Sequence, residues 1–77
     1  MRILITGGSG FIGTNAIEAF AKHASAILNY SVDAPLNPAQ MPYWRAGNIL
    51  DSAATTAVFR EFQPDRVLHL AARAECD

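Results

Sequence analysis

The sequence predicts an α/β fold in which helices alternate with the strands of one parallel sheet. An apolar, β-branched run at residues 3–5 leads directly into the glycine-rich string TGGSGFIG at residues 6–13. Apolar residues then recur at helical spacing through residues 11–23 and again through residues 52–62. Short apolar runs of strand length stand between and after these two segments. A helix between successive strands makes those strands parallel, because each crossover returns the chain to the same end of the sheet.

Composition limits the classes of function that the chain can have. Its 77 residues allow one small domain, and 51% apolar residues are ample for a packed core. The net charge is −1 without a basic run, which argues against nucleic acid and anionic membranes as partners. Met1 leads directly into an apolar strand and no run reaches the roughly 20 residues of a membrane span, so we expect a cytoplasmic protein. Cys76 is the only cysteine, so neither an internal disulfide nor a cysteine-based metal site is expected.

The first strand, at residues 2–6, should be buried on both faces, and the glycine string that follows it is typical of a phosphate-binding turn. Gly7 would allow a tight exit from the strand, and Gly10 has no side chain to hold a pyrophosphate away from the backbone. Gly13 would let the first helical turn lie close to the strand. The unpaired N–H groups at the start of the helix could then face phosphate oxygens. The alternative is an ordinary glycine-rich turn without a ligand, but the strand before it and the helix after it favour ligand binding.

The first thirteen residues, MRILITGGSGFIG, resemble the amino terminus of extended short-chain dehydrogenases/reductases of the NAD-dependent epimerase/dehydratase type. This resemblance implies a Rossmann-like, three-layer fold with sheet order 3-2-1-4 and NAD as the cofactor, with Phe11 and Ile12 also at the cofactor site. It runs through all 77 residues but covers only the first part of such an enzyme. We therefore expect residues 1–77 to be the N-terminal half of an NAD-binding domain, without the remainder of the family fold.

The second strand, predicted at residues 25–30, is followed by residues suited to a ribose. Asp33 lies 20 residues after Gly13, where a carboxylate can accept hydrogen bonds from ribose hydroxyls and would repel a 2′-phosphate. NAD is therefore favoured over NADP. In the family the acid usually closes the strand directly, and Ser31 holds that position here. Ser31 and Asp33 share a face of an extended segment, so either could meet the ribose, and Asp33 could instead only begin a turn.

The connection at residues 34–43 contains three prolines, which exclude a full helix. Asn37 and Pro38 could cap and begin a single helical turn. A short third strand is predicted at residues 43–46, with Trp44 as a core or edge anchor rather than a ligand contact.

The string GNILD at residues 47–51 resembles a family element that meets adenine. The resemblance implies that Asn48 accepts a hydrogen bond from the adenine amino group, although the family usually has Asp there, and that Ile49 packs on the ring. Asp51 is better explained as the N-cap of the next helix. That helix, at residues 52–62, has a core-facing stripe formed by Thr55, Val58, Phe59 and Phe62.

The fourth strand and its exit are predicted at residues 66–72. In the family the exit runs beneath the ribose and pyrophosphate, which implies cofactor contacts for Leu70, Ala71 and Ala72. His69 alternates within what should be a buried strand and has no acidic or nucleophilic neighbour in sequence, so a structural role is favoured over a catalytic one. In sheet order 3-2-1-4, this strand would form an exposed apolar edge.

Catalytic residues are not expected in this chain. The family's chemistry depends on a Tyr-x-x-x-Lys pair, but the residues four positions after Tyr30 and Tyr43 are Ala34 and Gly47. The predicted function is to bind the adenosine and pyrophosphate part of NAD for a nucleotide-sugar epimerase or dehydratase, and the chain should be inactive alone. Its nucleotide-sugar substrate would bind only to the full-length enzyme, and the chain should form a homo-oligomer or belong to a longer polypeptide. The alternatives are a non-catalytic dinucleotide sensor or interaction module of the same fold and, less favoured, a reductase.

Overall fold

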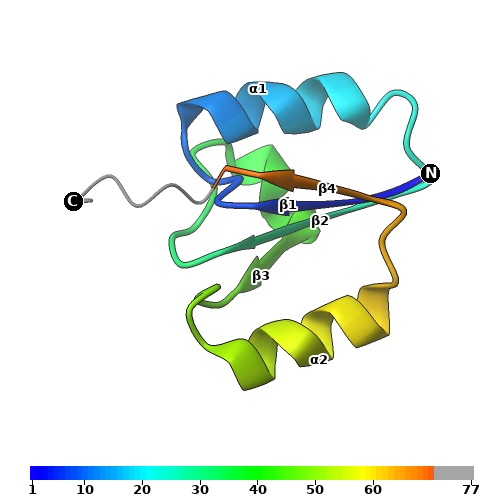
Figure 1. The fold of residues 1–77 in the computed structure, drawn as a ribbon. Helices are drawn as coiled ribbons and strands as arrows, with labels where there is room; N and C mark the ends of the chain where they lie inside the picture. The colour runs from blue at the N-terminus through cyan, green and yellow to red at the C-terminus, as the bar shows by residue number, and fades with distance from the viewer. Residues whose placement is uncertain (71–77) are drawn as a thin grey trace.

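The computed structural model describes residues 1–70, which form a four-stranded parallel sheet with two α-helices. The strand order is β3-β2-β1-β4, as the sequence predicts (Figure 1). In chain order the elements are β1 (Arg2–Thr6), α1 (Phe11–Phe20), β2 (Ala26–Ser31), the 3₁₀ helix η1 (Pro38–Tyr43), β3 (Trp44–Ala46), α2 (Ser52–Phe62) and β4 (Arg66–His69).

The two helices cover opposite faces of the sheet, so the domain has three layers (Figure 1). Side chains alternate between the faces of a strand, and this separates the core into two apolar clusters. On the α1 face, Ile17 packs against Ile3, Ile5 and Ile27. On the α2 face, the cluster consists of Leu4, Tyr30 and Val58, with Leu28, Phe59 and Phe62 packed against it. The Rossmann-like fold class is therefore confirmed.

Helix α1 is shorter than the predicted 11–23, because it ends at Phe20. The N–H groups of His23 and Ala24 both donate to the carbonyl oxygen of Phe20, at 2.9 and 2.8 Å. These bonds turn the chain back toward β2 and bring Ala24 against the α1-face core. The apolar spacing continues past the helix because the turn contributes to the same core.

The predicted helix starts are confirmed by their capping bonds. The Asn37 side chain accepts a hydrogen bond from the Ala39 N–H at 2.9 Å, with Pro38 as the first residue of η1. The Asp51 carboxylate accepts one from the Ala54 N–H at 3.1 Å and starts α2 at the predicted residue. Each cap satisfies an N–H group that has no partner within its own helix.

Strand β4 forms the edge of the sheet beside β1, and Val67 on it is 48% exposed. The expected apolar edge is confirmed, but the expectation that His69 lies in a buried strand was wrong, because its side chain is exposed. His69 Nδ1 lies 2.6 Å from the Thr6 hydroxyl, a hydrogen bond that joins the ends of β4 and β1. The expected sites at Ala71 and Ala72 lie outside the described residues.

Candidate functional site

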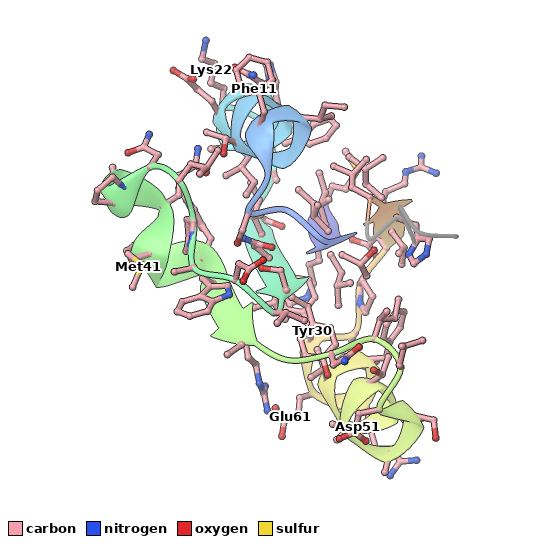
Figure 2. The ribbon with its side chains drawn as sticks, turned by 90° about the vertical axis from the view of Figure 1, so that its left-hand side faces the viewer. Phe11, Lys22, Tyr30, Met41, Asp51 and Glu61 are labelled. Atoms are coloured by element: carbon pink, nitrogen blue, oxygen red, sulfur yellow. The ribbon has the colours of Figure 1, made fainter. Side chains whose placement is uncertain are left out.

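A cavity of about 600 Å³ opens at the carboxyl-terminal edge of the sheet. Figure 2 looks onto this edge, with α1 above the sheet and α2 below it. Parallel sheets of this kind bind ligands in the crevice outside the carboxyl ends of their strands. The lining comes from four chain segments at the carboxyl ends of β1, β2, β3 and β4: Gly7, Ser9, Gly10, Tyr30, Ser31, Val32, Asp33, Ala34, Leu36, Gly47, Asn48, Ile49, Leu50 and Leu70.

The glycines of the turn after β1 have separate structural roles. Gly7 has a φ of 70°, in the left-handed region that favours glycine, and its N–H donates to the Tyr30 carbonyl oxygen at 3.1 Å. Gly10 lines the cavity, and a Cβ added there would meet no described atom within 4 Å. Gly13 lies directly over the backbone of Gly8, so a Cβ at Gly13 would collide with it. The close approach at Gly13 is therefore to the turn itself rather than to the strand.

The amino-terminal end of α1 is open to a ligand. Gly10 is its N-cap and supplies no side-chain acceptor, and the first turn contains no acidic residue. The positive end of the helix dipole and its first N–H groups are therefore not neutralised by side chains of the helix's own first turn.

Phe11 and Ile12, which the resemblance assigned to the cofactor site, do not line the cavity. Their side chains are 76% and 70% exposed, and Figure 2 shows Phe11 on the outer side of α1, away from Tyr30. Gly13, assigned to the same site, is buried against the backbone of Gly8 in the turn.

Ser31 and Asp33, the two residues proposed for the ribose, both line the cavity, but their side chains differ in environment. Ser31 is buried, and its hydroxyl is hydrogen-bonded to Ser9 Oγ at 2.6 Å and to the Asp33 carbonyl oxygen at 3.0 Å. Asp33 is exposed. Among residues 1–70, Asp33 is the only charged residue that lines the cavity.

The segment after β3, residues 47–50, forms another wall of the cavity. The Asn48 side-chain oxygen accepts a hydrogen bond from the Leu50 N–H at 2.9 Å, which closes a local turn. Within residues 1–70 the Asn48 side chain makes no other hydrogen bond, so its second lone pair and its amide N–H groups are available to a ligand. Ile49 and Leu50 add apolar surface beside it, and Leu70 contributes from the exit of β4. An apolar wall with a few polar groups is suited to a planar, partly polar ligand.

Asn29 supports the glycine turn beside the cavity, and the sequence reasoning missed this role. It is fully buried, accepts a hydrogen bond from the Gly8 N–H at 2.9 Å, and donates to Ser9 Oγ at 3.0 Å. The signal in the sequence was a polar residue within the apolar strand predicted at residues 25–30, because a buried amide requires partners.

Among residues 1–70 there is no group of three or more His, Cys, Asp or Glu side chains placed to hold a metal ion. In the same part of the chain, neither helix has the length and apolar character required to span a bilayer.

A parallel sheet whose glycine turn opens onto a crevice at the carboxyl-terminal edge defines a Rossmann-like domain of the dinucleotide-binding class. The chain belongs to the NAD dependent epimerase/dehydratase family, whose model matches residues 3–77.

Individual relatives agree with this family. The chain is 32% identical to the dTDP-glucose 4,6-dehydratase of Salmonella typhimurium, over all of this chain and 24% of the relative. The structure of dTDP-glucose 4,6-dehydratase from Bacillus anthracis in complex with NAD matches with a TM-score of 0.83 and 26% identity, over 96% of this chain and 27% of that one. The UDP-glucose 4-epimerase of Thermus thermophilus in complex with NAD matches with a TM-score of 0.80 and 30% identity, over 95% and 24%. The chain thus spans about a quarter of the length of these relatives.

Proposed function

We propose that residues 1–77 bind the adenosine and pyrophosphate part of NAD, as the N-terminal half of the cofactor domain of a nucleotide-sugar epimerase or dehydratase. The observation that carries this proposal is the cavity at the carboxyl-terminal edge, where the open glycine turn, the carboxylate of Asp33 and an apolar wall meet. Its volume of about 600 Å³ is within the range of small-molecule sites. The NAD complexes of two relatives with the same fold support it.

Each part of the cofactor has a suitable partner in the lining. The pyrophosphate would lie against Gly10 and the N–H groups at the start of α1, where no side chain obstructs it. The ribose hydroxyls would donate to Asp33. The adenine ring would pack on Ile49 and bond with Asn48. Bound NAD would supply a hydride acceptor for transient oxidation of a sugar carbon.

The charge of the site favours NAD over NADP. Within residues 1–70 the single charged residue that lines the cavity is Asp33, and its carboxylate would repel a 2′-phosphate at close range. We therefore expect the polypeptide that carries residues 1–77, at its natural length, to bind NAD more tightly than NADP. Titration calorimetry with both cofactors measures this preference. Equal or tighter binding of NADP would contradict the proposal.

The chemical step would require residues outside this chain, because its two tyrosines lack a lysine four positions later. Incubating the natural-length polypeptide with NAD and either dTDP-glucose or UDP-glucose separates the possibilities. Loss of water from dTDP-glucose, detected by mass spectrometry, indicates a dehydratase, and interconversion of UDP-glucose and UDP-galactose indicates an epimerase. A parallel incubation with NADH in place of NAD and with a keto-sugar nucleotide tests for a reductase, which would oxidise NADH as it reduces the keto group. Tight NAD binding with none of these reactions would favour the non-catalytic sensor.

A further inference from the structure

A buried chain of side-chain hydrogen bonds connects the glycine turn to the segment that carries Asp33. Asn29 Nδ2 lies 3.0 Å from Ser9 Oγ, Ser9 Oγ lies 2.6 Å from Ser31 Oγ, and Ser31 Oγ lies 3.0 Å from the Asp33 carbonyl oxygen. The three side chains of Asn29, Ser9 and Ser31 are only 0%, 6% and 5% exposed. They lie under the start of α1, where the α1 face of β2 changes from apolar Ile27 to polar residues.

Only one arrangement of hydrogens satisfies this chain. The Gly8 N–H donates to Asn29 Oδ1, which fixes the amide so that its NH₂ group faces Ser9. The single proton of the Ser31 hydroxyl is donated to the carbonyl oxygen of Asp33. Ser9 must therefore donate its proton to Ser31. Each residue therefore donates to the next one in the series: Asn29 to Ser9, Ser9 to Ser31, and Ser31 to the carbonyl oxygen of Asp33.

We propose that Ser31 and Ser9 are positioning residues that hold the Asp33 carboxylate in place and thereby set the discrimination between NAD and NADP. The proposal deepens the proposed function and rests on it. Asp33 is the residue that meets the ribose, and Ser31 acts through it. Although Ser31 and Asp33 both line the cavity, only Asp33 presents an exposed side chain to it.

The environment of Ser31 supports this division of roles. Its carbonyl oxygen accepts hydrogen bonds from the Gly47 N–H at 3.0 Å and from Trp44 Nε1 at 3.1 Å. Its hydroxyl accepts from Ser9 and donates to Asp33, so it has no proton left for a ligand. A residue held at both its main chain and its side chain is a rigid anchor for the next residues of the chain, which are exposed.

The position of Ser9 has a consequence for cofactor recognition. Ser9 belongs to the turn proposed for the pyrophosphate, yet its hydroxyl supports the segment proposed for the ribose. A change in the phosphate-binding turn should therefore alter recognition of the ribose, although the two sites come from different strands.

The experiment measures dissociation constants for NAD and NADP by calorimetry, with the natural-length polypeptide and its Asp33→Asn, Ser31→Ala and Ser9→Ala variants. The readout is the ratio of the NADP constant to the NAD constant. If the serines had only a structural role, their variants would bind NAD and NADP more weakly by the same factor, and this ratio would stay unchanged. We expect Asp33→Asn to lower the ratio most, by about tenfold. Each serine variant should lower it by roughly three- to tenfold, the usual effect of one hydrogen bond.

The matched control is Ser25→Ala, which removes a hydrogen-bonded serine hydroxyl next to Met1, at the opposite edge of the sheet. It should leave the ratio unchanged. The double variant Ser31→Ala/Asp33→Asn tests whether Ser31 affects cofactor preference only through Asp33. If Ser31 acts through Asp33, the double variant has the same ratio as Asp33→Asn alone.

The outcomes separate this inference from the proposed function. If the unchanged polypeptide does not bind NAD, the proposed function fails and the inference fails with it. If NAD is preferred but both serine variants leave the ratio unchanged, only the inference is overturned. If Asp33→Asn leaves the ratio unchanged, the inference and the assignment of the ribose to Asp33 are both overturned, although NAD binding by the domain stands. A further fall of the ratio in the double variant would show that Ser31 contacts the cofactor directly, which also overturns it. Asp33 is exposed, so its variant keeps the proposal testable even if the buried serine variants do not fold.

Discussion

Replacing Gly10 with valine should separate cofactor binding from folding. Gly10 has φ −81° and ψ −175°, which is extended backbone that any residue adopts, so valine causes no backbone strain. A Cβ at this position meets no described atom within 4 Å. The added side chain therefore extends into open space rather than into the core, at a residue that lines the cavity and where the pyrophosphate is proposed to lie.

Gly10→Val should have a smaller effect on the free energy of unfolding than on the free energy of NAD binding. Gly10 is the N-cap of α1, and exchanging a favourable cap residue for valine should lower the free energy of unfolding by about 1 kcal/mol at most. Displacement of the pyrophosphate should weaken NAD binding by about tenfold or more, which corresponds to roughly 1.4 kcal/mol or above. Gly10→Ala, with one added carbon, should have an intermediate effect on binding.

The measurements are calorimetric titration with NAD and urea unfolding of the natural-length polypeptide. Gly13→Val is the matched comparison, because a Cβ there collides with the backbone of Gly8, which cannot move aside as a flexible side chain can. Gly13→Val should lower stability as well as binding. If Gly10→Val binds NAD as tightly as the unchanged protein, the cofactor does not lie against this turn and the reasoning is refuted.

Two further predictions concern the stability of the domain. Asp51→Ala should lower the free energy of unfolding by about 1 kcal/mol, because it removes the hydrogen bond to the Ala54 N–H. Ser52→Ala, one residue later, is the control in urea unfolding, and equal losses in both variants would argue against the cap. The isolated polypeptide 1–77 should self-associate, since β4 is an edge strand with Val67 48% exposed. Sedimentation tests this, and a monomer whose urea transition is sharp and independent of concentration would contradict it.

The sequence alone was sufficient to predict those features whose signal lies within a few consecutive residues. The positive φ of Gly7, the caps at Asn37 and Asp51, and the bounds of α2 all follow from local backbone preferences and short-range hydrogen bonds. The sheet order also followed, because the glycine string resembles a family with one known topology, and the order observed is the one expected.

The tertiary structure alone decided which distant polar groups meet. Asn29 and Ser31 are 20 and 22 residues from Ser9, and they contact it because β1 and β2 pair in a register that sets Thr6 beside Tyr30. A shift of that register by one residue would turn both side chains to the other face of the sheet. The same dependence explains why His69 is exposed despite its alternating pattern. Burial on an edge strand is set by the layers that cover it, and the strand's own sequence does not specify those layers.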